Sequence, residues 1–276
     1  MHIAFVNPQG NFDAAGSYLT AHPDFGGQLV YVREVALALA AMGHRADILT
    51  RRVIDPEWPE FAAAEDGYPG HPNVRVLRFG CGPEGFLPKE ALWPHLREWV
   101  AHITAWYRSE GAWPDLWTGH YADGGLSAAL LQEQSGKPFT FAVHSLGAWK
   151  LDGLLRRNAT LDALREADAR YNFGARLAAE RVAMVRAAAI VTNSAIERCV
   201  HYAHPAYSDA VDARDKRRFA VIPPGVDLVV FAADVRSPRE ALVRSTIASA
   251  LGRDIAPERR SLPAVIAWSR LEPRKN

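Results

Sequence analysis

The chain has 276 residues, of which 49% are hydrophobic and 23% charged, a balance typical of a globular protein with a buried core. Its formal net charge of +1 gives no electrostatic reason to expect binding to nucleic acid or to a membrane surface. No apolar run is long enough to span a bilayer, and residues 1–8 lack the basic segment of a signal peptide. Cys81 and Cys199 stand far apart, in no CxxC pattern. We therefore expect a cytoplasmic protein.

Short apolar runs alternate with apolar residues at helical spacing along the first part of the chain. In order, the pattern predicts a strand over 3–6, a helix over 28–42, strands over 46–50 and 74–79, and a helix over 89–107. Gly43 is placed to end the first helix. Strands that alternate with helices in this way indicate a parallel sheet.

The same alternation continues to residue 222. It predicts in order a strand over 115–117, a helix over 126–134, a strand over 139–143, a helix over 161–186, a strand over 189–192, a helix from near Ser194 and a strand over 219–222. An α/β fold with a Rossmann-like, doubly wound parallel sheet accounts for all of these elements.

A domain boundary is expected after residue 222. The preceding strand is expected to end at Pro223, Pro224 and Gly225, because two prolines restrict the backbone and do not favour the start of a helix. Residues 263–268 then form the pattern of a buried strand, with Ser269 to Asn276 behind it. Because one strand cannot bury both of its faces alone, we expect the second domain to be truncated.

Two polar blocks follow predicted strands in the middle of the chain. Gly119 to Gly125 contains His120, Tyr121 and Asp123, and His144 to Lys150 contains Ser145. Because open parallel sheets bind ligands outside the carboxyl ends of their strands, these blocks predict a ligand crevice. Asp123, at a strand-to-helix junction, is expected to act as a helix N-cap.

Two other functional interpretations are weaker. His144-Ser145-Leu146-Gly147 permits an α/β-hydrolase with Ser145 as nucleophile, but the branched Val143 would crowd the required turn. His201 and His204 could share a helical face, yet no further ligand stands at suitable spacing, so we expect no metal site.

Six segments, in order and along the whole chain, resemble the sucrose-phosphate synthase family, retaining glycosyltransferases of the GT-B fold. They are Gly26-Gly27-Gln28, Phe86-Leu87-Pro88-Lys89, Thr118 to Gly125, His144 to Gly147 with Lys150, Ile222 to Asp227, and Ser269 to Asn276. The resemblance implies that residues 1–222 form the N-terminal acceptor-binding domain. Residues 223–262 would be the interdomain linker and the start of the donor domain, and residues 263–276 the first strand of the nucleotide-sugar-binding domain.

The resemblance also implies an activity: transfer of glucose from UDP-glucose or ADP-glucose to fructose 6-phosphate, giving sucrose 6-phosphate with retention and without a metal or other cofactor. The partners would be a sugar phosphate and a nucleotide sugar. Since the family's acidic donor-binding motif would lie beyond Asn276, we expect no appreciable activity from these residues alone.

Roles for individual residues follow from the resemblance. Acceptor binding is assigned to Gly26, Gln28, Lys89, Tyr121, Ser145, Lys150, Arg170 and Arg176. Donor binding is assigned to Gly27, Arg270 and Lys275, where the two cations would neutralise the leaving diphosphate, and His144 would act on the donor sugar as the catalytic residue.

One position departs from the family pattern. The family carries two arginines where this chain has Ala175 and Arg176, and Arg170 lies close enough in sequence to compensate. The loss of one guanidinium removes a bidentate phosphate ligand, which leaves a different or unphosphorylated acceptor open. A sugar-phosphate binding module, or one half of a split glycosyltransferase completed in trans by a donor domain, is the other alternative.

Overall fold

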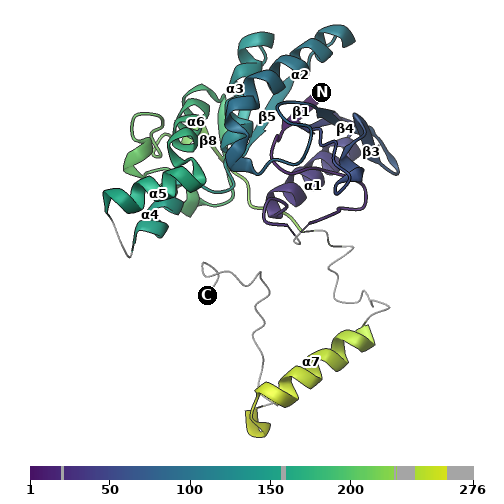
Figure 1. The fold of residues 1–276 in the computed structure, drawn as a ribbon, viewed down its shortest axis with the longest axis vertical. Coiled ribbons are helices and arrows are strands. Elements are labelled where there is room, and N and C mark those ends of the chain that lie inside the picture. The colour runs from purple at the N-terminus through teal and green to yellow at the C-terminus, as the bar shows by residue number, and fades with distance from the viewer. Residues whose placement is uncertain (20–21, 157–159, 227, 229–239, 260–276) are drawn as a thin grey trace. The chain divides into compact units, whose positions relative to one another are not determined.

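A computed structural model describes residues 1–19, 22–156, 160–226, 228 and 240–259. The chain divides into two compact units, Met1–Pro223 and Pro224–Asn276. In Figure 1 the ribbon is coloured by residue number, from purple at the start of the first unit to yellow in the second. The sheet and the candidate site lie in the first unit.

The first unit is built on an eight-stranded sheet with the order β3-β4-β2-β1-β5-β6-β7-β8. All neighbouring strands are parallel except β3, which pairs antiparallel with β4 at one edge. The strands are β1 (His2–Val6), β2 (Arg45–Arg51), β3 (Glu65–Tyr68), β4 (His71–Phe79), β5 (Leu116–His120), β6 (Phe139–Ala142), β7 (Ala189–Thr192) and β8 (Phe219–Val221). The predicted doubly wound sheet is therefore confirmed.

The strand order reverses between β1 and β5. The chain runs from β1 to β2 and β4 on one side and then returns to place β5 on the other side of β1. Loops that leave the carboxyl ends of such a pair diverge, and the space between them is where doubly wound sheets bind ligands. The polar blocks after β5 and β6 lie at this edge.

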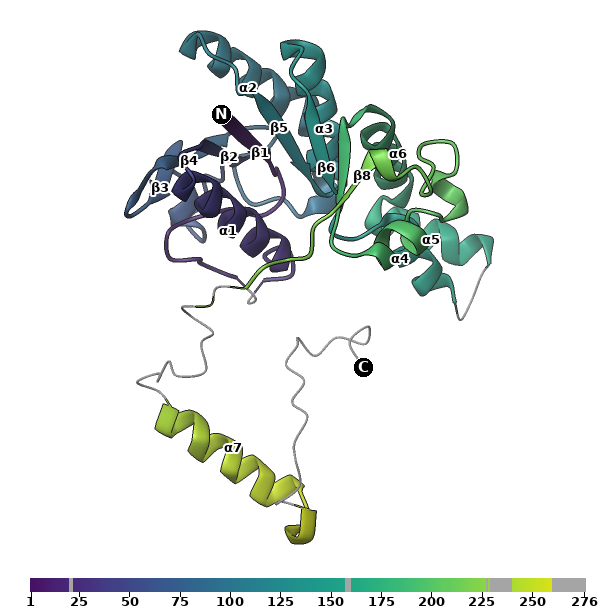
Figure 2. The ribbon, with the colours of Figure 1, turned by 180° about the vertical axis from the view of Figure 1, so that it is seen from behind.

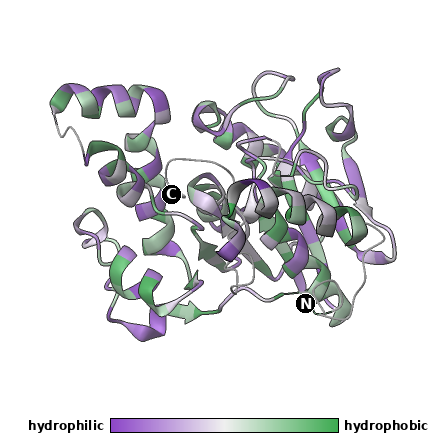
Figure 3. Cartoon of the chain, turned by 90° about the horizontal axis from the view of Figure 1, so that it is seen from below, coloured by the Kyte–Doolittle hydropathy of each residue, from purple (hydrophilic) through white to green (hydrophobic). Residues whose placement is uncertain are grey.

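Helices cover both faces of the sheet (Figures 1 and 2). They are α1 (Gly27–Ala41), α2 (Leu96–Glu110), α3 (Tyr121–Ser135), α4 (Gly147–Leu155), α5 (Leu161–Tyr171) and α6 (Phe173–Arg186). Figure 3 shows that hydrophobic and hydrophilic residues are interspersed along the chain. α2 buries the apolar residues Leu96, Trp99, Val100 and Ile103 at helical spacing. Gly111 and Gly136, both at a φ of 69°, end α2 and α3 in the left-handed conformation that glycine adopts without strain.

Neighbouring residues of β1 belong to different core clusters because side chains alternate across a strand. Ile3 and Phe5 pack with buried residues of α1. Ala4 and Val6 join the larger cluster, which includes residues of α2, α3 and α6. The central strand is thus buried on both faces, and its end at Val6 is held in a fixed position.

Several elements differ from the expectations, and α4 was not predicted. The helix predicted over 89–107 begins at Leu96, after short 3-10 turns at Lys89–Ala91 and Trp93–His95. The second of these turns contains Pro94, whose missing N–H fits a helix start better than a helix interior. β3 was not predicted because it is short and polar, as edge strands often are. α3 begins at Tyr121 rather than at residue 126.

The helix predicted over 161–186 is two helices. Asn172 separates α5 from α6 with a φ of 51°, in the left-handed region that asparagine tolerates better than most residues. Its side-chain amide donates to the carbonyl oxygen of Glu90 at 2.7 Å. Near Ser194, the predicted helix is one short helical segment with a π turn at Glu197–His201.

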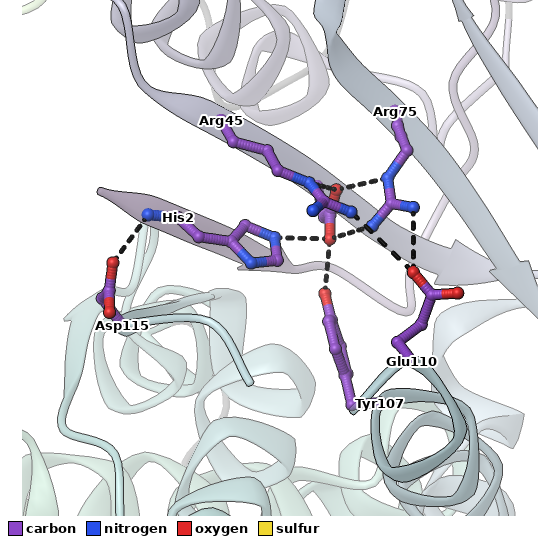
Figure 4. A network of polar contacts seen from close by, with 7 residues as sticks. His2, Arg45, Arg75, Tyr107, Glu110 and Asp115 are labelled. Atoms are coloured by element: carbon purple, nitrogen blue, oxygen red, sulfur yellow. Dashed lines mark hydrogen bonds and ion pairs between the residues drawn. The ribbon is translucent and has the colours of Figure 1, made fainter. Parts of the chain in front are cut away.

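A buried ionic network connects the strands near their amino ends, at the end of the sheet away from the two polar blocks (Figure 4). Asp47 is fully buried in β2 and accepts hydrogen bonds from Arg75 Nε and Nη2 at 2.8 Å each and from the Tyr107 hydroxyl at 2.8 Å. His2 Nε2 lies 2.6 Å from the same carboxylate. β1, β2, β4 and α2 therefore meet at one charged side chain.

The second unit is described only in part. It contains α7 (Glu240–Asp254) and a 3-10 turn at Pro257–Arg259, in a region where no regular element was predicted. The strand predicted over 263–268, and the rest of the segment 263–276, lie outside the described residues. None of the helices in the described ranges is long and apolar enough to cross a membrane.

Candidate active site

Three helices begin at the carboxyl edge of the sheet, close to the ends of β1, β5 and β6. α1 starts at Gly27, α3 at Tyr121 directly after β5, and α4 at Gly147. The unpaired N–H groups of first helical turns favour anions and hydroxyl oxygens. The edge thus carries backbone donors before any side chain is considered.

The Gly26-Gly27-Gln28 segment forms the start of α1. Gly26 is the N-cap residue in an extended conformation, and the space where a side chain of Gly27 would lie is open. Gln28 Nε2 donates to Asn7 Oδ1 at 2.5 Å, which connects α1 to the loop after β1. The open backbone at Gly27 would let a ligand approach closely.

Three predicted acceptor-binding cations lie near Tyr121, which is itself a predicted acceptor-binding residue. Lys150 Nζ donates to the Tyr121 hydroxyl at 3.1 Å, and the Arg176 guanidinium lies 4.5 Å from the ring centroid. Lys89, Tyr121 and Arg176 also line one small pocket of about 20 Å³, together with Glu90, Trp93, Asp123 and Tyr171. Lys89, Tyr121, Lys150 and Arg176, from four separate segments, are hereafter the basic cluster.

Lys89 is paired with acids in this structure. Its Nζ lies 2.6 Å from Asp24 Oδ1 and 3.1 Å from Glu90 Oε1. Burial alone would lower the pKa of Lys89, but the hydrogen bond and attraction to Asp24 outweigh it and raise the pKa. Lys89 therefore keeps its charge, and a phosphate would have to compete with Asp24 for it.

Arg176 supports the start of α4 as well as facing the pocket. Its Nε donates to Glu180 Oε1 at 2.9 Å, and its Nη2 donates to the carbonyl oxygen of Ser145. The Glu180 carboxylate in turn accepts from the Gly147 backbone N–H at 2.9 Å and from the Tyr207 hydroxyl. Two of the three guanidinium nitrogens are thus used to hold the His144–Gly147 turn.

The prediction that Asp123 caps α3 is wrong. The N-cap residue is His120, without a side-chain cap, and Asp123 is the third residue of the helix. Asp123 Oδ1 accepts from the N–H of Gly124 at 2.9 Å, and its buried Oδ2 has no hydrogen-bond partner among the described residues. Burial raises the pKa of Asp123 to about 7. The carboxyl group lines the same pocket as the basic cluster.

His144 follows β6 and is hydrogen-bonded to a second histidine. Its Nε2 lies 2.9 Å from His120 Nδ1, and its backbone φ is 58°. Tyr121, which follows β5, has a φ of 66°. Strained backbone at two adjacent strand ends is characteristic of functional sites.

The other predicted positions are separate or lie outside the described residues. Arg170 is exposed and lies over the ring of Tyr171, with its Cζ 5.1 Å from the centroid, and Ala175 is exposed. Ser145 Oγ makes no hydrogen bond with a histidine among the described residues, so the geometry offers no base for the hydrolase interpretation. Arg270 and Lys275 fall in the segment that the structure does not describe.

No group of three or more metal-ligating side chains occurs in the described part of the chain. His204 Nε2 lies 3.0 Å from Asp152 Oδ2, and both His201 and His204 contact the Trp149 ring. These two histidines therefore have structural partners.

Sequence reasoning missed several residues of the site: His120 as the partner of His144, Asp24 as the partner of Lys89, and Glu180 with Tyr207 behind Arg176. Only the spacing of Arg176 and Glu180 on one helix face signalled a contact. The other pairs join segments far apart in the sequence.

Comparisons with known proteins show which family the chain resembles. Residues 26–225 match the family described as glycosyl transferase 4-like domain. A probable sucrose-phosphate synthase from Thermosipho melanesiensis is 43% identical over 276 residues, which are 100% of this chain and 59% of that protein. A mannosylfructose-phosphate synthase from Agrobacterium fabrum is 33% identical over 188 residues, 65% of this chain and 37% of that protein.

Among solved structures, a sucrose-phosphate synthase from Thermosynechococcus elongatus aligns with a TM-score of 0.67 and 24% identity, over 90% of this chain and 52% of that one. The GT-B type of fold and the resemblance to sucrose-phosphate synthases are thereby confirmed. The chain spans only 59% and 37% of the two curated relatives. Because the family match over residues 26–225 covers well over half of the chain, the chain belongs to the glycosyl transferase 4-like domain family.

Proposed function

We propose that this chain binds the acceptor in a retaining, metal-independent glycosyltransferase that moves glucose from UDP-glucose or ADP-glucose to fructose 6-phosphate and forms sucrose 6-phosphate. The observation that carries the proposal is the basic cluster. Lys89, Arg176 and Tyr121 line one pocket, and Lys150 donates to the Tyr121 hydroxyl. Tyr121 directly follows β5, which lies beside β1 where the strand order reverses. Such a cluster suits a phosphate dianion, which needs several charge-assisted donors.

The names of the relatives support the class of acceptor. Both a sucrose-phosphate synthase and a mannosylfructose-phosphate synthase are named for sugar-phosphate products. In this proposal Lys89, Lys150 and Arg176 would hold the phosphate, Tyr121 and Ser145 would supply hydroxyl groups, and Gly26 with Gln28 would face the sugar. His144 would act on the donor glucose, while Gly27, Arg270 and Lys275 would serve the donor diphosphate.

Calorimetric titration of the chain tests the acceptor site. We expect binding of fructose 6-phosphate and much weaker binding of fructose. Lys89→Met should weaken fructose 6-phosphate binding roughly 10- to 100-fold, since hydrogen bonds to charged groups contribute about 1.5–3 kcal/mol. Lys216→Met, at an exposed lysine remote in sequence, is the control and should bind as the parent chain does. Equal affinity for fructose and its phosphate would contradict a phosphate site.

Ala175 supports a second candidate, a transferase or binding module with an unphosphorylated acceptor. Ala175→Arg distinguishes the two: it should strengthen fructose 6-phosphate binding if the site already takes a phosphate, and leave sugar binding unchanged. Transfer itself needs a separate assay with UDP-glucose and fructose 6-phosphate. We expect no product from these 276 residues, and product from a polypeptide that extends over the full length of the relatives.

A further inference from the structure

Three side chains from neighbouring segments form a hydrogen-bonded chain that ends at His144. Thr118 Oγ1 in β5 lies 3.1 Å from His120 Nε2, and His120 Nδ1 lies 2.9 Å from His144 Nε2. The two imidazole rings are within 24° of parallel, with centroids 5.2 Å apart. This is the geometry of two rings joined edge to edge by one hydrogen bond.

Packing restricts both rings. Phe5 of β1 stacks on His120 with the centroids 5.7 Å apart, and Tyr31 of α1 meets His144 edge-on at 5.1 Å. The His144 backbone is held at a φ of 58°, a conformation that costs roughly 1–3 kcal/mol for a residue other than glycine. The surrounding structure therefore fixes the ring of His144 as well as its partner.

The hydrogen-bond chain has two possible proton arrangements. In one, the Thr118 hydroxyl donates to His120 Nε2, His120 Nδ1–H donates to His144 Nε2, and the proton of His144 is on Nδ1. In the other every donor is reversed, and the Thr118 hydroxyl hydrogen needs a further acceptor. Thr118 Oγ1 makes no other hydrogen bond among the described residues, so the second arrangement leaves the hydrogen of this buried hydroxyl without an acceptor. The first arrangement leaves only His144 Nδ1–H without a protein acceptor, and His144 is partly exposed, so solvent or a ligand can accept from it. The first arrangement is therefore favoured.

We propose that Thr118 and His120 are positioning residues that hold His144 as the tautomer with its proton on Nδ1, so that His144 acts in the site as a neutral hydrogen-bond donor. No described residue bonds to His144 Nδ1, which leaves this donor available to a ligand. The tautomer depends only on residues of this polypeptide and not on the proposed function. Only the identity of the ligand, a donor-sugar hydroxyl, rests on the proposed function.

The charge state of the pair agrees with this arrangement. Burial lowers the pKa of His144 to about 4, and burial together with repulsion from His144 lowers the pKa of His120 well below its ordinary value. Tyr31, the other titratable group packed against His144, has a pKa raised by burial and stays neutral. Both imidazoles are thus neutral at pH 7. A hydrogen bond between the two rings requires this, because one ring nitrogen must donate the single shared proton and the other must accept it.

Nitrogen-15 NMR of the histidine rings in the 276-residue chain tests the proposal, because protonated and unprotonated ring nitrogens have distinct shifts. The parent chain should show His144 protonated at Nδ1 with a roughly tenfold excess, the ratio that one hydrogen bond supports. Thr118→Val, which keeps the shape and removes the hydroxyl, should bring the two His144 tautomers close to equal populations. Thr104→Val on α2 removes a buried hydroxyl that has no partner in the ranges that the structure describes, and it should leave His144 unchanged.

Substitution of His120 supplies a rescue experiment. His120→Phe fills the space against Phe5 but has no ring nitrogen, so the His144 tautomers should mix. His120→Asn places an amide N–H where Nδ1–H was and should restore the Nδ1 tautomer. A parent chain with the His144 proton on Nε2, or an unchanged tautomer in both Thr118→Val and His120→Phe, would overturn the proposal. These outcomes are independent of whether fructose 6-phosphate binds.

Discussion

At the scale of single residues, two buried aspartates have opposite surroundings. Asp47 accepts from Arg75 and Tyr107 and is close to His2, whereas Asp123 Oδ2 has no partner in the described part of the chain. Burial alone would raise the pKa of Asp47, but hydrogen bonds from His2 and Arg75 outweigh it and lower the pKa to about 2. Burial dominates at Asp123, where the pKa rises to about 7. One aspartate therefore stabilises the fold as an anion, and the other resists ionisation.

Asp47→Asn should destabilise the first unit by about 3–5 kcal/mol at pH 7, because it leaves the Arg75 charge without its partner. The folded pKa of Asp47 is below its ordinary value, so its contribution is complete above about pH 4 and is lost as the pH falls toward 2. Urea unfolding at pH 7 and at pH 3 measures the difference, which should shrink at the lower pH. Asp162→Asn, at a side chain 85% exposed, is the control, and an equal loss there would contradict the prediction.

Asp123→Asn should stabilise the fold at pH 8 and have a clearly smaller effect at pH 5. The folded pKa is raised, so the wild-type chain loses stability on account of Asp123 as the pH rises from about 4 through 7. Asparagine cannot ionise and keeps an oxygen for the N–H of Gly124. We expect a gain of roughly 1–3 kcal/mol at pH 8, the cost of a buried unsatisfied group. Thermal unfolding at both pH values checks it, and a gain of the same size at pH 5 would show that ionisation is not the cause.

At the scale of elements, the site depends on how closely α3 approaches β1. A Cβ on Gly124 would lie 2.3 Å from the carbonyl oxygen of Val6, and one on Gly125 would lie 2.5 Å from the Phe141 ring. The two glycines let the first turn of α3 lie against the strand ends. Tyr121 and Asp123 are thereby brought to the pocket that Lys89 and Arg176 share.

Gly124→Ala should destabilise the fold by more than about 1–3 kcal/mol, the usual cost of overpacking, because its neighbour is backbone that cannot rotate away. Gly153→Ala is the matched control in α4. No atom lies within 4 Å of the added methyl group, and alanine should stabilise that helix by up to about 1 kcal/mol. Urea unfolding of both variants measures the contrast. Similar effects from the two substitutions would mean that α3 does not pack on β1 as described.

The elements that the sequence predicted well are those with strong local periodicity. β1, α1 and the alternation of strands with helices follow from apolar spacing, which responds to burial on one or two faces. The division at Asn172 and the late start of α2 did not follow, because a left-handed residue and a proline turn interrupt the chain without interrupting its apolar pattern. His144 and Tyr121 were identified by resemblance, but their contacts depend on residues from distant segments.

At the scale of the whole molecule, the first unit contains what a stable domain needs. The eight-stranded sheet and the two large core clusters lie within Met1–Pro223. The basic cluster and the His120–His144 pair lie there too. Burial of this core supplies most of the stability of a domain this size, so the second unit is not needed for folding.

A polypeptide that ends at Pro223 should therefore unfold in one cooperative transition, with a midpoint within a few degrees of the 276-residue chain, and should bind fructose 6-phosphate with the same affinity. A polypeptide that ends at Arg218 is the matched comparison, because it lacks β8. That strand pairs with β7, and its Phe219 packs against the Tyr202 ring at 5.2 Å. We expect the shorter polypeptide to lose several kcal/mol, since β7 becomes an edge and buried Tyr202 loses its cover. Calorimetric melting of the three polypeptides provides the measurement. If the one that ends at Pro223 melts without cooperativity, the first unit depends on residues of the second.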